Sequence, residues 1–530
     1  MKRTKGAIST GNKLTSEAGA QILMQGGNAF DAAIAASFAS FVVECTLTNL
    51  GGSGFMTAYS GKDDKDYAFD FFVNVPGLGA KSKVEPDFFP IEVDFGTVKQ
   101  EFHIGFGSIA VPGNVAGLFH AHSKLGSIPI KEIMAPAIEY AKNGFTIDKM
   151  QERILGILEP IFTYYDEGKA KFLKNGKTLK QGDILQFSEL ADTMDHLARH
   201  GVDDFYKGDI AHEILKVLDG RGSLLTADDL AGYVSIERIP LEVDYRGHTI
   251  ITNPPPSSGG SLICYGLKLM ERFDLGAYAY GKGDYVDLMA SVMAITNNAR
   301  GRHFDARLFD ENIAREFLTD EKISGSFDEV QRLLQCTEDC KFDDKIHNHL
   351  GSTTHISVVD ENNNAASITT SNGEGCGYIV PGVGLMMNNM LGEEDLNPHG
   401  FHKHPVGVRL SSMMAPTIVK RNGIPEIILG SGGSNRLRTA IMQSIVKILD
   451  YKMPIDEAVN SARLHYELGK LDIEPGYSEG DIAPLRDKFD ITLWDHKSMF
   501  FGGVHAVSKT NGKMSGGGDS RRGGCFIKVE

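Results

Sequence analysis

Residues with the chemistry of a nucleophile stand at the start of a predicted strand. The segment "STTHISVVD" places Thr353 and Thr354 directly before an alternating run, 355–359, that is typical of a β-strand. A threonine hydroxyl is a weak nucleophile near neutral pH and needs a base within hydrogen-bonding reach. His355 lies two residues along the same strand face, and we expect it to face the sheet interior rather than to act as that base.

Cleavage of the chain between Ser352 and Thr353 would supply a base. A free α-amine has a pKa of about 7.7–8.0, so it could accept the proton of the hydroxyl on its own residue. In an intact chain the same nitrogen is an amide and has no such basicity. The hydroxyl could itself attack the Ser352 carbonyl to make the cut. The alternative is that Thr353 and Thr354 are ordinary residues at the start of a strand.

A glycine turn forms the second candidate feature. The stretch "EIILGSGGSNRLRTAIMQ" predicts a strand over 426–430, a turn and a helix over 436–450. Backbone N–H groups at such a turn are unpaired and point outward at the positive end of the helix dipole. Gly432 and Gly433 could therefore form an oxyanion hole. A nucleotide site is a weaker interpretation, because the segment lacks the Lys-Ser/Thr pair of a phosphate-binding loop.

A serine pair is the third feature. Ser411 and Ser412 in "VRLSSMMAPTIV" precede a predicted strand over 415–420 and could donate hydrogen bonds to a substrate carboxylate. Taken alone, adjacent serines at this position are more often a cap or a turn.

The elements that must position these residues follow from periodicity. Asn28 can cap a helix that begins at Ala29 in "NAFDAAIAASFASFVV", and its many alanines allow close packing on both sides. Strands dominate after Thr353, at 355–359, 365–371, 383–387, 415–420 and 426–430. Strands and helices in this mixture predict a layered α/β sandwich.

Bulk composition excludes several classes of function. The 530-residue chain has a formal net charge of −15, which argues against a nucleic-acid partner. No apolar run reaches the ~20 residues of a membrane span, and the charged N-terminus is followed by no apolar signal region. We therefore expect a cytoplasmic protein with no membrane association. The six cysteines are scattered, so we expect reduced thiols and no zinc site.

Together these motifs resemble the γ-glutamyltranspeptidase family of N-terminal-nucleophile hydrolases. The segments that carry the resemblance span most of the chain: "GGNAFDAA" (26–33), "NLGGSGFM" (49–56), "VPG" (111–113), "NPPPSSGG" (253–260), "TTHISVVD" (353–360), "GLMMNN" (384–389), "LSSM" (410–413) and "GSGGS" (430–434). The resemblance implies a four-layer αββα sandwich. It also implies autocatalytic cleavage of a zymogen into a large subunit, 1–352, and a small subunit, 353–530, which stay together in one body and could pair as a dimer.

The same resemblance implies a mechanism and a substrate class. Thr353 would attack γ-glutamyl amides of the glutathione type and form an acyl-enzyme. Gly432 and Gly433 would hold the oxyanion, and Ser371 would support the nucleophile. Water or an amine would then take the acyl group. The substrate is a small amide or peptide, and neither a metal nor an organic cofactor is implied.

Substrate-binding positions depart from the family pattern. The family's carboxylate-binding arginine is replaced by Phe72 in "DFFVNVP", and Arg409 is the candidate substitute. Glu393 aligns with the aspartate that meets the substrate amine, and Ser411 and Ser412 remain. Two alternatives follow: an acylase of the same mechanism for a non-glutamyl amide, such as a glutaryl type, or an unprocessed, non-catalytic relative.

Overall fold

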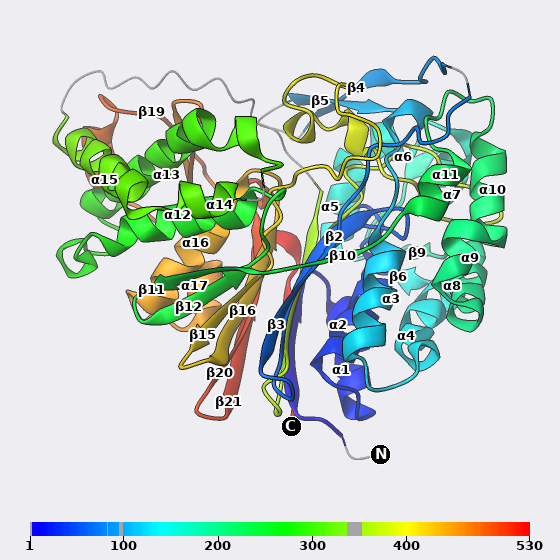
Figure 1. Cartoon of the computed structure of the whole chain (residues 1–530), viewed down its shortest axis with the longest axis horizontal. Helices are drawn as coiled ribbons and strands as arrows, with labels where there is room; N and C mark the ends of the chain where they lie inside the picture. The colour runs from blue at the N-terminus through cyan, green and yellow to red at the C-terminus, as the bar shows by residue number, and fades with distance from the viewer. Residues whose placement is uncertain (1–2, 82, 95–98, 311, 337–351) are drawn as a thin grey trace.

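The computed structural model describes residues 3–81, 83–94, 99–310, 312–336 and 352–530. Within these ranges, two large β-sheets lie face to face in the middle of the molecule, and helices cover the outer side of each (Figure 1). The expected four-layer αββα sandwich is therefore confirmed.

The first sheet has the strand order β10-β3-β2-β14-β13-β1-β22, with antiparallel neighbours throughout. Its strands are β1 (Gly6–Thr10), β2 (Ser53–Ser60), β3 (Lys65–Phe71), β10 (Ile236–Arg238), β13 (Thr354–Asp360), β14 (Ala365–Ser371) and β22 (Cys525–Val529). At its centre β13 pairs with β14 so that Thr354 lies opposite Thr370. Strands from both sides of the 352/353 junction thus share one hydrogen-bonded sheet.

The second sheet has the order β11-β12-β15-β16-β20-β21. Its strands are β11 (Leu241–Tyr245), β12 (His248–Thr252), β15 (Thr417–Arg421), β16 (Ile424–Gly432), β20 (Gly503–Thr510) and β21 (Lys513–Gly518). An apolar cluster that includes Ile251, Val359 and Val507 packs between the two sheets. This packing sets β13 of the first sheet against β16 of the second, which brings their functional ends together.

Helices form the two outer layers (Figure 1). On the first sheet lie α1 (Lys13–Met24), α2 (Ala29–Val43) and α3 (Asn114–Leu125), backed by α4 (Ile130–Asn143) and α8 (Ser188–His200). On the second lie α12 (Gly259–Glu271), α16 (Arg436–Leu449) and α17 (Ile455–Asn460), backed by α13 (Gly283–His303) and α15 (Asp320–Gln335). Within the described ranges, every helix is too short or too polar for a bilayer crossing.

Smaller elements complete the chain. The helices are α5 (Lys149–Ile157), α6 (Glu159–Phe162), α7 (Asp166–Phe172), α9 (Val202–Lys207), α10 (Asp209–Leu218), α11 (Ala227–Gly232), α14 (Ile313–Phe317) and α18 (Glu479–Ile482). The strands are β4 (Phe89–Asp94), β5 (Lys99–Ile104), β6 (Phe145–Thr146), β7 (Leu173–Lys174), β8 (Lys177–Thr178), β9 (Ile184–Leu185), β17 (Leu464–Glu467), β18 (Lys470–Ile473) and β19 (Asp490–Leu493).

The alanine-rich helix α2 shows how local sequence fixes an element. Asn28 accepts hydrogen bonds from the backbone N–H groups of Phe30 and Asp31, while the Asp31 carboxylate accepts from the Asn28 N–H. This is the predicted N-cap in its capping-box form. Every residue of the helix is buried, because small side chains let it pack against neighbours on all sides.

Two expectations are wrong. Residues 383–387 form turns with isolated bridges instead of a strand, because Gly382 and Gly384 take positive φ angles of 75° and 73° that interrupt extended pairing. Cys336, expected to be a reduced thiol, is disulfide-bonded. The thiols of Cys45, Cys264, Cys376 and Cys525 are free, as expected.

Candidate active site

Thr353 lies where the facing sheets meet the glycine turn. It directly precedes β13, and the β13–β14 register sets Ser371 across from it. Gly432 ends β16 of the other sheet. A Cβ atom on Gly432 would stand 2.1 Å from the Thr353 carbonyl oxygen, closer than any real contact, so only glycine fits there. The predicted nucleophile and the predicted turn are thus in contact.

The peptide bond before Thr353 is held from both sides. The Ser371 hydroxyl donates a hydrogen bond to the carbonyl oxygen of Ser352 and accepts one, at 3.0 Å, from the Gly373 N–H. The Ser352 N–H donates to Oε1 of Glu374 at 2.9 Å. The Ser371 contact polarises the carbonyl whose carbon a neighbouring hydroxyl would attack, so the predicted supporting residue lies at the predicted cut.

In the described part of the chain, no side chain is placed to act as a general base for the Thr353 hydroxyl. Among the described residues, no titratable side chain makes a hydrogen bond to it. The ring nitrogens of His355 are 2.8 Å from Thr369 Oγ1 and 2.9 Å from Ser357 Oγ, deep between the sheets. Burial holds the pKa of His355 well below its usual range. The expectation that His355 faces the interior is confirmed, and the α-amine of a cut chain is left as the base.

The glycine turn that contacts Thr353 has an unusual backbone conformation. Gly433 has a φ of +124°, a conformation that L side chains rarely adopt, and Ser434 follows at +48° before α16 begins. Within the described ranges, the N–H groups of Gly433 and Ser434 have no hydrogen-bond acceptor. Such amides at a helix N-terminus favour negative charge. Gly433 is one of the two predicted oxyanion-hole residues, whereas Gly432 lies within β16 opposite Gly503 and Ser434 has the second free amide.

A small cavity adjoins Thr353. It is lined by Phe72, Ser352, Thr353, Ser371, Gly373, Met390, Glu393, Asp395, Leu396, Ser412, Met413, Met414, Ser434 and Leu437. The predicted substrate residues Glu393 and Ser412 are among them, and Ser411 is not. The Ser412 hydroxyl accepts a hydrogen bond from the Met414 N–H at 3.1 Å. The serine pair therefore contributes one cavity residue and one that lies behind it.

Arg409 does not reach this cavity. Its guanidinium donates to Asn74 Oδ1 at 2.7 Å, to the Asp70 carboxylate at 3.0 Å and to the Val234 carbonyl at 2.7 Å. It also stacks on the Tyr233 ring, with its Cζ 4.9 Å from the centroid. With all three nitrogens engaged, Arg409 ties its own segment to residues that precede the 352/353 junction. The expectation that it binds substrate is not supported.

Glu393, which lines the cavity, pairs with a second buried carboxyl group, Glu374, that was missed from the sequence. Glu374 and Glu393 share a hydrogen bond, and apart from it neither Oε2 of Glu374 nor Oε1 of Glu393 has a partner in the described protein. The pair therefore needs one shared proton. Burial raises the pKa of Glu374 to about 7, and burial together with the neighbouring Glu374 holds the pKa of Glu393 well above its usual range.

A second missed residue is Arg522. Its Nη1 donates to the Thr353 carbonyl at 3.1 Å, and the side chain is buried. It ends an ordinary "GGGDSRR" stretch near the C-terminus, and no motif distinguishes it from a surface arginine. It lies between β21, which pairs with β20, and β22, which pairs with β1 next to β13, and these pairings carry it into the site.

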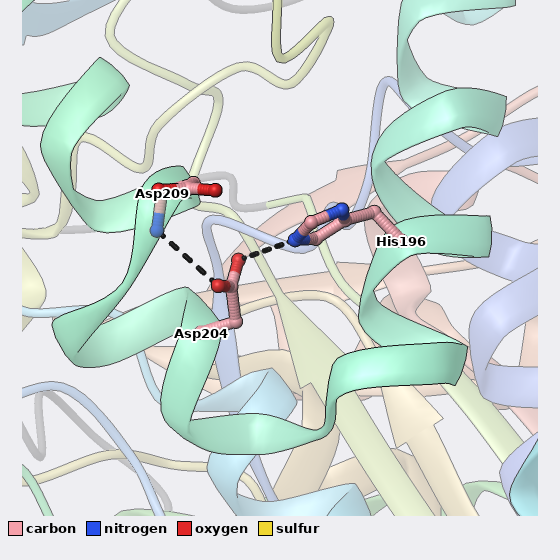
Figure 2. A group of neighbouring side chains, drawn as sticks. All are labelled: His196, Asp204 and Asp209. Atoms are coloured by element: carbon pink, nitrogen blue, oxygen red, sulfur yellow. Dashed lines mark hydrogen bonds and ion pairs between the residues drawn. The ribbon is translucent and has the colours of Figure 1, made fainter.

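A cluster far from the cavity has the residue types of a metal site. Figure 2 shows His196, Asp204 and Asp209. The Asp204 carboxylate accepts from the N–H groups of Asp209 and Ile210 at 3.2 and 3.4 Å, and it lies 3.0 Å from His196 Nε2. Asp204 thus caps α10 and fastens it to α8. These contacts account for the cluster as a structural junction.

Comparisons with known proteins agree with this geometry. The model of a family described as Gamma-glutamyltranspeptidase matches residues 15–529. The glutathione hydrolase proenzyme of Escherichia coli (strain K12) is 30% identical over 512 residues, covering 92% of this chain and 86% of that protein. The acylase ACY 1 proenzyme of Pseudomonas sp. (strain SE83) is 30% identical over 531 residues, covering 99% and 94%. The crystal structure of cephalosporin acylase from Bacillus halodurans shares the fold, with a TM-score of 0.85 at 22% identity, covering 100% of this chain and 96% of that one.

Proposed function

This chain belongs to the gamma-glutamyltranspeptidase family of self-processing hydrolases, and from that premise we propose that Thr353 is its catalytic nucleophile. Cleavage after Ser352 would give a large subunit, 1–352, and a small subunit, 353–530. The mature enzyme would transfer the acyl group of a small amide or peptide to water or to an amine. The single observation that carries this proposal is the held Ser352–Thr353 bond, with Ser371 on its carbonyl and Gly432 against the nucleophile.

Self-cleavage follows from this arrangement. The Thr353 hydroxyl oxygen adds to the Ser352 carbonyl carbon, while the Ser371 hydroxyl stabilises the charge on the carbonyl oxygen. The C–N bond then breaks and the nitrogen takes up the hydroxyl proton, which leaves an ester between Ser352 and Thr353. Water hydrolyses this ester to a Ser352 carboxylate and frees the Thr353 hydroxyl beside its new amine.

Turnover would use the same groups on an external amide. The α-amine of Thr353 takes the hydroxyl proton as the oxygen attacks and gives a proton to the departing amine. The free amides of the turn, at Gly433 and Ser434, would stabilise the tetrahedral oxyanion. One lost donor of this kind costs about 10²–10³-fold in rate.

Two acyl classes are candidates for the substrate. The E. coli relative is named a glutathione hydrolase, which favours γ-glutamyl amides, and Glu393 stands in the cavity for the substrate amine. The Pseudomonas relative is named an acylase. The absence of arginine, lysine and histidine from the described cavity lining favours the second class, an acylase for a non-glutamyl amide. We also propose that the two subunits stay associated after cleavage.

Amide hydrolysis by matched threonine variants tests the proposal. We expect the wild type to release p-nitroaniline from short acyl p-nitroanilides and Thr353→Ala to lose at least about 10³-fold in kcat/KM. Thr353→Ser, which keeps a hydroxyl and an α-amine, should mature and retain measurable activity. Full activity in Thr353→Ala would refute the assignment of Thr353.

A further inference from the structure

The cavity beside Thr353 has an apolar wall and an acidic wall. The apolar side chains are those of Phe72, Met390, Leu396, Met413, Met414 and Leu437. Glu393 and Asp395 form the acidic wall, and no described lining residue is an arginine, lysine or histidine. A carboxylate that entered would meet like charge and no cation. Like-charge contacts in a desolvated site strongly disfavour binding.

No described arginine near the cavity is free to compensate. Phe72 occupies the position where an arginine was expected, and its ring stacks on Phe55 with centroids 5.3 Å apart. Arg409 is fully engaged outside the cavity, as described above. Arg522 donates to the carbonyls of Thr353 and Met499 and does not line the cavity. The stacked Phe72 ring therefore stands where the family has a cation, and no neighbouring arginine takes over the contact with a substrate carboxylate.

The acidic wall, in contrast, has no cationic partner in the described lining. Glu393 is only 5% exposed, and it shares a hydrogen bond with Glu374. Apart from that shared proton, Oε1 of Glu393 and Oε2 of Glu374 have no partner in the described protein. A buried negative charge without a cationic partner is costly, and an ammonium group that donates to it removes that cost. The proton-sharing pair, with one negative charge between its two carboxyl groups, thus fits a cationic amine.

We propose that the acyl group accepted at this site carries an amine and no carboxylate, and that Glu374 acts with Glu393 to select it. This inference rests on the proposed function, because it takes the cavity to be the acyl subsite of Thr353. The amine would donate to the Glu393 carboxyl group, and the one negative charge that the proton-sharing pair of Glu374 and Glu393 carries would face it. Glu374 is then a specificity-determining residue for which the local sequence gives no signal.

Four p-nitroanilides separate the two charges of a glutamyl group. The γ-glutamyl compound has both the amine and the carboxylate. The 4-aminobutyryl compound lacks only the carboxylate, the glutaryl compound lacks only the amine, and the butyryl compound lacks both. All four have the same carbon chain from the amide to the branch point. Their kcat/KM values on the processed enzyme measure each charge independently.

The proposal predicts that 4-aminobutyryl p-nitroanilide is the best substrate. We expect at least a tenfold advantage over the γ-glutamyl compound, and a larger one over the glutaryl compound. A fastest rate with either carboxylate-bearing compound would overturn the inference, and so would equal rates for all four or inertness of all four in a processed enzyme. A chain that remains uncut and inert by mass spectrometry would instead refute the proposed function itself.

A conservative variant tests the role of Glu374. Glu374→Gln keeps an oxygen to accept the Ser352 N–H but removes the charge. We expect the preference for 4-aminobutyryl over butyryl to fall about tenfold, mainly through a higher KM for the 4-aminobutyryl compound. An unchanged preference in matured Glu374→Gln would show that Glu374 plays no part. If the variant fails to mature, the four-substrate comparison on the wild type still decides the central statement.

Discussion

At the residue scale, glycine at position 432 is required by space. Because a Cβ there would overlap the Thr353 carbonyl oxygen, Gly432→Ala must displace the nucleophile or the turn. We predict that this variant loses at least about 10²-fold in self-cleavage rate, measured by denaturing gel electrophoresis over time. The matched control is Gly301→Ala in α13, where a Cβ meets no atom within 4 Å. The control should mature normally and gain up to about 1 kcal/mol of stability.

Ser371 gives a second prediction at this scale. Its hydroxyl is the side-chain donor to the Ser352 carbonyl, so Ser371→Ala should slow cleavage about 10²–10³-fold. Ser371→Thr keeps the hydroxyl and should cleave within about tenfold of the wild type. The time course of small-subunit appearance measures both variants. Equal rates in the wild type and Ser371→Ala would contradict the role assigned to this hydroxyl.

At this scale the sequence predicts positions well where they depend on neighbours in the chain, while the catalytic roles stay predictions. Thr353, the Gly432 turn and Ser371 sit at the ends of strands that local pattern identifies. Arg409 was expected at the cavity as the substitute for the arginine that Phe72 replaces, but Asp70 and Asn74 hold its guanidinium elsewhere. Glu374 and Arg522 could not be predicted, since the contacts that give them a role, with Ser352 and Glu393 for Glu374 and with Thr353 for Arg522, come from the fold and not from a local motif.

At the element scale, Glu44 links α2 to β13. It accepts hydrogen bonds from Thr15 Oγ1 at 2.7 Å and Thr354 Oγ1 at 2.6 Å, and burial raises its pKa to about 7. A carboxyl whose pKa is raised in the folded state binds its proton more tightly there than in the unfolded chain. Its contribution to stability is therefore present at low pH and is lost as the pH rises through about 7.

Chemical unfolding at two pH values tests this link. In a Thr353→Ala background, which keeps one chain, the parent should lose up to about 3 kcal/mol between pH 5 and pH 8 relative to Glu44→Gln. The amide has no proton to titrate, so the difference isolates Glu44 from the other buried carboxyls. Parallel stability profiles for the two proteins would show that Glu44 does not titrate with a raised pKa.

Helices and strands were predicted well where a single hydrophobic periodicity dominates the local sequence. The cap at Asn28, helix α16 and strands β13 and β14 follow periodicity and were found within a few residues. The strand expected over 383–387 failed because positive φ angles at Gly382 and Gly384 outweigh its apolar pattern. Strand order in the two sheets could not come from periodicity, which says nothing about partners.

At the scale of the whole molecule, the topology explains how a cut chain would stay together. In the first sheet β1 and β2 belong to the part before the junction, while β13, β14 and β22 belong to the part after it. The second sheet likewise joins β12 to β15 across the two parts. Separating the subunits would break both sheets and expose the core between them. A single cut would therefore leave the two parts in one native particle.

Intact mass spectrometry of the denatured protein tests the central claim most directly. The 57.7 kDa chain should separate into two polypeptides, the smaller beginning at Thr353 with a free amine, while the native sample elutes as one species. The Thr353→Ala protein should give one undivided mass. An uncut wild-type chain that still hydrolyses its amide substrate would contradict the claim, because Thr353 would then have no amine to accept its proton.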